Sequence, residues 1–195
     1  MSNDLNRAIE VLNRGGIIIF PTDTAFGIGC RVDDKKAIER LFGIRKRPHD
    51  QAVPLLVNGV SMAKSYAFDI PHEVEDKLIG PYWPGALTVV VKCKKNKIPR
   101  LVRGGGETIG LRMPNHMITL ALIRSLGVGL LGPSANFHGE DTPFDFNDLN
   151  PKLTKLVDYV LPGKCNLKGV STVVDTTVKP WKILRQGAVS ITMDT

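Results

Sequence analysis

The most constraining feature of this chain is a run of three isoleucines at residues 17–19, which lies between two glycines and a proline. Because β-branched residues favour strands, the run predicts a short buried strand. Pro21 has no backbone donor and ends that strand. The sequence Thr-Asp-Thr follows at residues 22–24, so short polar side chains gather where the strand ends.

Two glycines, Gly27 and Gly29, lie a few residues further along the chain. Glycine lets the backbone approach a neighbouring group closely, so we interpret this pair as room for a small polar ligand. The alternative is an ordinary turn, because Thr and Asp side chains commonly bond to local backbone. This segment by itself does not decide between a ligand site and a turn.

The rest of the chain predicts helices and strands that do not follow a strict βαβ alternation. Apolar spacing and end signals indicate helices over residues 5–12, 34–42, 61–68, 71–79 and 117–126. Short β runs indicate strands over residues 53–57, 87–91, 108–112, 128–134, 157–161, 172–176 and 182–184. A rigid turn is expected at residues 81–85 and a mobile polar loop at 141–148. The last two strands are joined by a short turn, so we expect an α/β (α+β) fold whose sheet contains antiparallel pairs and carries helices on its faces.

Length and composition place further bounds on the chain. At 195 residues it is long enough for one buried core and short for two, so we expect one domain over residues 1–195. No apolar stretch approaches the ~20 residues of a membrane span, and no secretory signal begins the chain, so we expect a cytoplasmic protein. Cys30, Cys93 and Cys165 have no C-x-x-C spacing and the histidines are scattered, which predicts reduced thiols and no metal ligands.

The charge balance favours polyanionic partners. Lysine and arginine outnumber aspartate and glutamate by 26 to 19, which gives a net charge of +7 and suits nucleotide phosphates or RNA. Between Lys92 and Arg103 there are cations and no acid, and such a run is either a solvated loop or an RNA contact. No aromatic residue lies inside the run, so it does not predict a surface for base stacking.

Familiar phosphate-binding and nucleophile motifs are missing. The chain has neither a Walker phosphate loop nor a G-x-S-x-G nucleophile elbow. A phosphate group would therefore be held by cationic side chains and by polar groups on turns. The candidates are Arg45, Lys46, Arg47, Arg112, Arg185, Ser134 and Asn136. Taken singly, Arg112 could instead pair with a surface acid, and Ser134 and Asn136 could simply close a turn.

Several of these residues belong to motifs that follow one another along nearly the whole chain. The motifs are PTDT-x-x-G-x-GC at residues 21–30, RKRP at 45–48, WPG at 83–85, GLRMPNH at 110–116, GPSAN at 132–136, STVVD at 171–175 and LRQG at 184–187. This order resembles the YrdC-type threonylcarbamoyl-AMP synthases (L-threonylcarbamoyladenylate synthases) in their single-domain form. The resemblance implies a YrdC-like fold, in which a twisted open mixed sheet, largely antiparallel, forms a concave active-site cavity.

The same resemblance implies a reaction and its partners. L-Threonine, bicarbonate or CO2, and ATP accompanied by Mg²⁺ would give threonylcarbamoyl-AMP and pyrophosphate, for the threonylcarbamoyladenosine modification of tRNA. The expected macromolecular partners are tRNA or tRNA-modifying transferases, without a membrane. The chain would act as a monomer or a homodimer.

The resemblance also assigns roles to individual residues. The catalytic set would be Arg45, Lys46, Arg47, Ser134 and Asn136. Threonine would contact Thr24, Asn58, Arg112 and Ser171. ATP would be surrounded by Arg47, Gln51, Thr108, Ser134, Asn136, Thr142 and Arg185, and the chain would supply no metal ligand.

One motif departs from the family pattern. The basic loop of the family usually reads Lys-x-Arg, whereas this chain has Arg45, Lys46 and Arg47. Arg and Lys bind phosphate with different geometry. The sequence therefore leaves open whether Arg45 or Lys46 faces ATP.

Two other functions remain as alternatives. A non-catalytic RNA-binding module is suggested by the net charge and by the cations of residues 92–103, and its binding would weaken steeply with salt. A carbamoyl-transfer domain of the hydrogenase-maturation type would instead act on carbamoyl phosphate. Such domains occur within longer chains.

Overall fold

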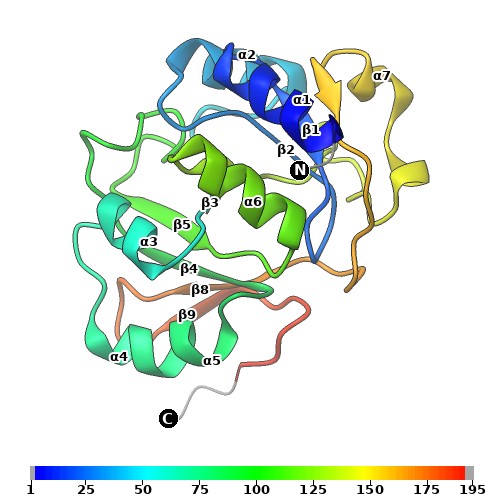
Figure 1. Ribbon diagram of the computed structural model, residues 1–195. Coiled ribbons are helices and arrows are strands. Elements are labelled where there is room, and N and C mark those ends of the chain that lie inside the picture. The colour runs from blue at the N-terminus through cyan, green and yellow to red at the C-terminus, as the bar shows by residue number, and fades with distance from the viewer. Residues whose placement is uncertain (1–2, 192–195) are drawn as a thin grey trace.

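The computed structural model describes residues 3–191, which form two mixed sheets covered by helices (Figure 1). The six-stranded sheet has the order β6 (Leu130–Leu131), β3 (Leu55–Leu56), β5 (Thr108–Arg112), β4 (Leu87–Lys92), β8 (Thr172–Asp175) and β9 (Lys182–Arg185). The three-stranded sheet has the order β2 (Gly27–Gly29), β1 (Ile18–Phe20) and β7 (Tyr159–Val160). The expected open mixed sheet with helices on its faces is thus confirmed.

Parallel and antiparallel pairs alternate across the large sheet. β4 runs antiparallel to β5 and parallel to β8, while β8 and β9 form the expected antiparallel pair. Val89 lies opposite both Leu111 and Val174, so the three central strands are in register at their middle. This register brings the carboxyl end of β5 beside the amino ends of β4 and β8.

The helices lie around these sheets (Figure 1). Their bounds are α1 (Asn3–Asn13), α2 (Lys35–Arg45), α3 (Val60–Tyr66), α4 (His72–Val74), the π-helical turn η1 (Glu75–Ile79), α5 (Gly80–Tyr82), α6 (Met117–Leu126), the 3-10 turn η2 (Phe146–Asp148) and α7 (Pro151–Thr154). α1 and α6 pack against each other through a cluster that includes Leu12 and Ile123, both fully buried. Burying one such side chain contributes about 1.5–3 kcal/mol. In the described part of the chain no helix has the length and apolar character needed to cross a membrane.

The ends of α2 determine where the basic loop begins. Asp34 caps the helix by accepting a hydrogen bond from the Ala37 amide, as the sequence predicts. At the other end Lys46 adopts a left-handed conformation with φ of 52°, and its amide bonds back to Gly43 and Phe42. The chain therefore reverses direction between Arg45 and Lys46, and the two side chains point to different environments.

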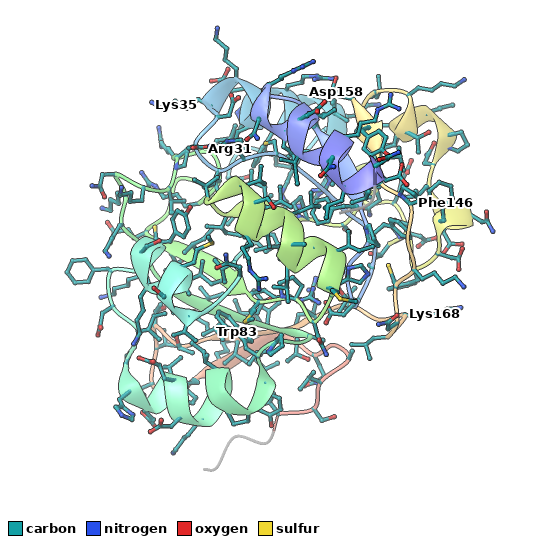
Figure 2. The ribbon with its side chains drawn as sticks, viewed as in Figure 1. Arg31, Lys35, Trp83, Phe146, Asp158 and Lys168 are labelled. Carbon is teal, nitrogen blue, oxygen red and sulfur yellow. The ribbon has the colours of Figure 1, made fainter. Side chains whose placement is uncertain are left out.

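An ion pair between Arg40 of α2 and Asp158, which is labelled in Figure 2, joins α2 to the segment before β7. Asp158 precedes β7 and receives hydrogen bonds from both terminal nitrogens of Arg40. The same carboxylate accepts the Ile17 amide at 2.7 Å. This contact anchors the start of β1 and hence the polar turn that follows it.

The expectation that Gly27 and Gly29 make room for a ligand is wrong for Gly29. Both glycines lie in β2, which pairs with β1. A Cβ at Gly29 would overlap the carbonyl oxygen of Leu131, so this glycine admits another strand of the protein. A Cβ at Gly27 would lie 3.0 Å from the Phe20 ring, although Gly27 also lines the cavity described below.

Several element boundaries also differ from those expected. The strands expected at 53–57 and 128–134 are reduced to two residues each. Val53 bonds to the loop at residue 102, whereas Val57 and Pro133 each make only a single backbone bond to a strand, with Arg112 and Ile28. The turn expected at 81–85 begins later, since Pro81 and Tyr82 complete α5. Within residues 141–148, Asp145 caps the short turn η2.

Candidate active site

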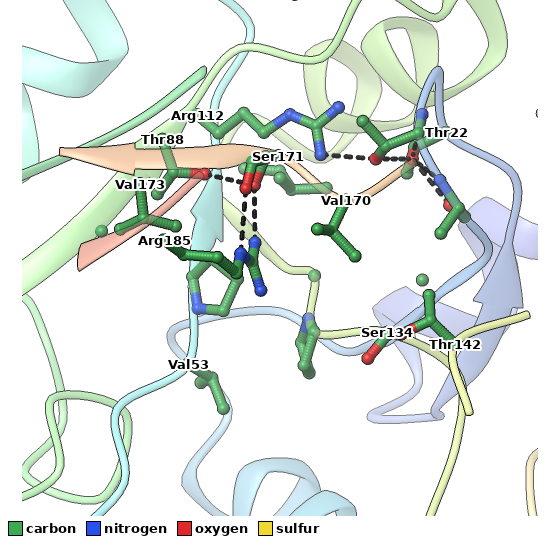
Figure 3. Close-up of a pocket in the computed structure, with 18 of the residues that line it drawn as sticks. Thr22, Val53, Thr88, Arg112, Ser134, Thr142, Val170, Ser171, Val173 and Arg185 are labelled. Carbon is green, nitrogen blue, oxygen red and sulfur yellow. Dashed lines mark hydrogen bonds between the residues drawn. The ribbon is translucent and has the colours of Figure 1, made fainter. Parts of the chain in front are cut away.

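A cavity of about 350 Å³ lies between the turn that follows β1 and one face of the six-stranded sheet (Figure 3). Small-molecule sites in proteins commonly measure about 300–1,000 Å³. Alternate residues of β4 and β5 form the cavity floor: Thr88, Val90, Gly110 and Arg112. A Cβ at Gly110 would lie 2.9 Å from Thr88 Cγ2, so glycine keeps this part of the floor open.

The Thr-Asp-Thr turn after β1 is held by its own side chains. Thr22 Oγ1 donates to the Ala25 carbonyl at 2.7 Å and accepts the Thr24 and Ala25 amides. Thr24 Oγ1 lies 3.0 Å from Thr22 Oγ1, and either hydroxyl can donate in this contact. Thr24 Oγ1 also accepts a hydrogen bond from Arg112 Nη1 at 2.7 Å.

Arg112 occupies the carboxyl end of β5 and is almost completely buried. Its Nη2 donates to Asp23 Oδ1 at 2.5 Å and its Nε donates to the Gly85 carbonyl at 2.9 Å. The Trp-Pro-Gly turn is therefore a support for this side chain. With the Thr24 bond, three of the five guanidinium hydrogens have protein acceptors, so two remain for a ligand.

A second polar group lies on the adjoining strands. Ser171 Oγ is 2.9 Å from Thr88 Oγ1 and accepts a hydrogen bond from Arg185 Nη2 at 3.0 Å (Figure 3). Arg185 also donates from Nε to the Ser171 carbonyl. β9 thus holds an arginine over the start of β8, at the rim of the cavity.

The opposite wall contains Arg45, which is 2% exposed. Its Nε and Nη2 donate to the backbone and side-chain oxygens of Asn136, each at 3.0 Å. Asn136 Oδ1 also accepts Ser134 Oγ at 2.7 Å, so one amide oxygen orients both an arginine and a serine. The remaining nitrogen of Arg45, Nη1, is buried and has no hydrogen-bond partner in the part of the chain that the structure describes.

Arg47 lies on the loop that follows α2. Its Nε and Nη2 donate to the carbonyls of Gln51 and Ala52, at 3.1 and 2.6 Å. The side chain therefore folds onto its own loop while still lining the cavity. This arrangement keeps Arg47 and Arg45 on the same wall.

Burial lowers the pKa of every arginine in this cavity, because removal from water disfavours the charged form. For Arg45 burial and, to a lesser extent, the charge of Arg47 lower the pKa to about 10. For Arg112 burial lowers the pKa, and the neighbouring Asp23 carboxylate opposes it. Within residues 3–191 only Arg112 of these arginines has a carboxylate within 4 Å, so the cavity carries a positive charge that an anionic ligand would neutralise.

Comparison with known proteins identifies the family. A family model named for Sua5, YciO and YrdC, and described as telomere recombination, matches residues 10–187. The chain belongs to the Sua5/YciO/YrdC family. The family that the ordered motifs predicted is therefore confirmed.

Relatives within the Sua5/YciO/YrdC family differ in what is known of them. The uncharacterized protein YciO of Escherichia coli K12 is 32% identical over 184 residues, which cover 94% of this chain and 88% of YciO. A protein of Pyrococcus abyssi named threonylcarbamoyl-AMP synthase is 32% identical over 185 residues, covering 94% of this chain and 54% of that protein. The chain thus spans about half the length of the Pyrococcus relative.

A solved structure of this family shares the fold. The crystal structure of P. abyssi Sua5 complexed with L-threonine superposes with a TM-score of 0.86 at 30% identity. The match covers 94% of this chain and 54% of that chain.

Most residues that the family motifs nominate lie together around the cavity. Those that line it are Thr24, Arg45, Arg47, Arg112, Ser134, Thr142, Ser171 and Arg185. They come from motifs spread across the chain, and the tertiary structure brings them to one place. Of the two alternatives in the basic loop, the structure places Arg45 in the cavity wall.

Five nominated residues do not line the cavity: Lys46, Gln51, Asn58, Thr108 and Asn136. Lys46 turns outward at the end of α2, where its ammonium group lies 5.7 Å from the centre of the Phe137 ring. Gln51 is exposed, and Thr108 lies two residues before Gly110 on the outer part of β5. Asn136 is 8% exposed and acts on the cavity through Arg45 and Ser134.

Three polar residues at the site were not nominated as site residues: Thr22, Asp23 and Thr88. Thr88 is the one polar side chain before Lys92 in the strand of sequence LTVVVK, and it is 4% exposed. A hydroxyl at an inward-facing position of an otherwise apolar strand is unusual, and this pattern could have identified Thr88 from the sequence. Asp23 could not have been found in this way, because its partner is 89 residues away.

Proposed function

We propose that this protein is a threonylcarbamoyl-AMP synthase, a nucleotidyltransferase that converts L-threonine, bicarbonate or CO2, and ATP into threonylcarbamoyl-AMP and pyrophosphate. The observation that carries the proposal is the set of arginines around one cavity, most of which have no carboxylate partner among residues 3–191. Guanidinium groups bind phosphate or carboxylate oxygens in pairs, and two members of the set, Arg45 and Arg112, are buried. The name of the Pyrococcus relative and the threonine in the Sua5 complex supply the chemical class.

The threonine end of the cavity would be the region of Arg112. Its two unused N–H groups can bind the substrate carboxylate, while Asp23, Thr24 and the Gly85 carbonyl hold the guanidinium in place. The hydroxyls of Thr88 and Ser171 lie on the same floor and can meet the substrate hydroxyl or amine. Binding here would direct the threonine amine towards the centre of the cavity.

The phosphate end would be the opposite wall. Arg45 presents a buried N–H that has no partner among the described residues, and Arg47, Ser134 and Thr142 line the same cavity. Arg45 remains charged at neutral pH, because its pKa of about 10 is still well above 7. Fixed cations placed before the substrate arrives stabilise developing charge on a phosphoryl group without reorganisation.

The reaction requires positioning more than proton transfer. A carbamate formed on the threonine amine attacks the α-phosphorus of ATP, and its oxygen displaces pyrophosphate. Holding the two substrates in line can contribute about 7–11 kcal/mol to lowering the barrier. The described lining has arginines and hydroxyls but no carboxylate or histidine that could serve as a general base, which agrees with a mechanism of this kind.

Magnesium would enter with the nucleotide. The described lining residues include no carboxylate, and residues 3–191 contain no cluster of three His, Cys, Asp or Glu side chains placed for a metal. Mg²⁺ commonly keeps several waters and binds largely through substrate phosphates, so these residues fit an ion carried by ATP. The ion would neutralise part of the triphosphate charge, and the arginines would neutralise the rest.

The product is a reactive mixed anhydride, so we also propose that it passes to a transferase that modifies tRNA adenosine. The name threonylcarbamoyl-AMP synthase in the relatives supports this placement. The reaction would take place in the cytoplasm, where tRNA and ATP meet.

Pyrophosphate release tests the proposal. We expect release only when L-threonine, bicarbonate, ATP and Mg²⁺ are all present, with threonylcarbamoyl-AMP detected by mass spectrometry. Arg112→Ala should abolish the threonine-dependent release of pyrophosphate, whereas Arg124→Ala, which replaces an exposed arginine on α6, should not change it. Equal release without threonine would overturn the proposal in favour of a nucleotide hydrolase or a carbamoyl-phosphate enzyme.

A further inference from the structure

Gly104 lies in the loop between β4 and β5 and is not among the described residues that line the cavity. Its φ is 57°, a left-handed conformation that favours glycine. A Cβ at this position would lie 2.6 Å from the Asp50 carbonyl oxygen and 2.7 Å from the Ala52 amide nitrogen. Ordinary contacts of a Cβ begin near 3.4 Å, so glycine is required for these two stretches of backbone to approach as they do.

The two loops meet because the strands that they enter are neighbours. β3 and β5 run parallel, with Leu55 opposite Leu111, so the loops that precede them reach the same edge of the sheet. The Val53 amide donates to the Val102 carbonyl at 2.9 Å, which joins the loops just before β3 begins. Gly104 follows two residues after this bond, where the backbones are closest.

The loop that Gly104 supports also holds Arg47. Arg47 Nε donates to the Gln51 carbonyl at 3.1 Å, and its Nη2 donates to the Ala52 carbonyl at 2.6 Å. The Gln51 carbonyl and the Ala52 amide belong to one planar peptide group, which moves as a rigid unit. This group accepts a hydrogen bond from Arg47 and abuts Gly104. A shift imposed at Gly104 therefore reaches the guanidinium through a single peptide.

We propose that Gly104 is a positioning residue for Arg47, which it keeps directed at the phosphate groups of a nucleotide. A side chain at position 104 would displace the peptide group to which Arg47 donates. The threonine end of the cavity would keep its geometry, because Arg112 makes its hydrogen bonds to other elements. This role for Gly104 rests on the proposed function, in which Arg47 belongs to the phosphate end.

Calorimetry with three probes, ATP, inorganic tripolyphosphate and L-threonine, tests this role. Gly104→Ala should weaken the binding of ATP and of tripolyphosphate by about tenfold or more, because a hydrogen bond to a charged group accounts for that much affinity. The affinity for threonine should remain that of wild type, which also shows that the variant is folded. If alanine prevents folding, Gly104→Asn introduces the same Cβ with less strain, because Asn adopts a positive φ more readily.

Gly105 provides the matched control. Its φ is 78°, so alanine is strained there as well, but its Cβ would lie 3.8 Å from the flexible Arg100 side chain and meet no described backbone outside its immediate chain neighbours within 4 Å. Gly105→Ala should therefore lose stability and still bind ATP and tripolyphosphate as wild type does. The comparison separates the close approach at Gly104 from the cost of a positive φ.

A double-mutant cycle separates positioning from a general disturbance of the loop. If Gly104 acts through Arg47, Gly104→Ala should have little further effect on ATP binding once Arg47→Ala has removed the guanidinium. An effect that is independent of Arg47 would instead add to that of Arg47→Ala.

Three results would overturn this role: equal affinity for ATP and tripolyphosphate in Gly104→Ala and Gly105→Ala, an equal loss of threonine binding in Gly104→Ala, or additive effects in the cycle. A different result would overturn the proposed function, namely wild type that binds tripolyphosphate but neither binds threonine nor releases pyrophosphate in its presence. Tripolyphosphate titrations of the variants would then still decide the role of Gly104. Wild type that binds neither ATP nor tripolyphosphate would overturn both.

Discussion

Replacement of Asp23 by asparagine tests the buried pair on which the threonine end of the cavity depends. The side chains of Arg112 and Asp23 are 7% and 3% exposed, and Asp23 supplies the carboxylate beside this guanidinium. Asparagine keeps the shape but removes the charge, and removal of one partner from a buried ion pair costs about 3–5 kcal/mol. Since 1 kcal/mol shifts the midpoint by about 2–4 °C at this chain length, we expect Tm to fall by about 6–20 °C.

L-Threonine should reverse part of this loss. If its carboxylate binds the free N–H groups of Arg112, it supplies a new counter-charge to a guanidinium that the substitution leaves unpaired. Scanning fluorimetry should therefore show a larger threonine-induced rise in Tm for Asp23→Asn than for wild type. Threonine amide, which has no carboxylate, should not produce the difference.

A matched control comes from the surface. Asp33 pairs with Arg31 at 2.8 Å, but its side chain is 49% exposed, and such pairs contribute only about 0–1 kcal/mol. Asp33→Asn should therefore melt close to wild type. The reasoning is refuted if Asp23→Asn melts no lower than Asp33→Asn, and the role of Arg112 is refuted if threonine shifts Asp23→Asn and wild type equally.

Three further predictions concern other parts of the site and the scaffold. Arg112→Ala should weaken the binding of threonine, measured by calorimetry, far more than the binding of ATP. If the variant binds threonine with normal affinity, Arg112 has only a structural role. Arg45→Ala should lower turnover much more than Lys46→Ala, because only Arg45 lines the cavity, and the reverse order would contradict this placement. Burial would raise the pKa of Asp158, but hydrogen bonds from Arg40 and the Ile17 amide outweigh it and hold the pKa below 3.8. The contribution of Asp158 to the free energy of unfolding is therefore present above about pH 4 and is lost as pH falls further. The free energy of unfolding, measured with urea, should therefore fall less steeply below about pH 4 for Asp158→Asn than for wild type. An equally steep fall in both proteins would show that Asp158 makes no such contribution.

The sequence by itself was sufficient for the local structure and for the family. The isoleucine run predicted β1, Asp34 predicted the start of α2, and apolar spacing predicted α6 with the bounds that the structure shows. These features depend on neighbours within a few residues, so propensity and capping determine them. The ordered motifs predicted the family for a similar reason, because each motif is a short contiguous segment.

The lengths of the strands and the role of Gly29 could be determined only from the tertiary structure. Residues 53–57 have the composition of a full strand, yet only Leu55 and Leu56 pair, because a partner's length limits a strand as much as its own sequence does. Gly29 is compatible with a nearby ligand or a nearby strand, and only packing shows that the neighbour is the Leu131 carbonyl. Neither the strands that pair with Leu55 and Leu56 nor the carbonyl beside Gly29 can be recognised from the neighbouring residues in the sequence.

The contacts that define the site were likewise decided by the fold. Asp23 meets Arg112 across 89 residues and Thr88 meets Ser171 across 83, and no local pattern specifies such pairs. The left-handed residue after α2 directs Arg45 inward and Lys46 outward, although both carry a positive charge. The sequence determines which chemical groups are available, but distances between them depend on strand order and register, which are properties of the whole chain.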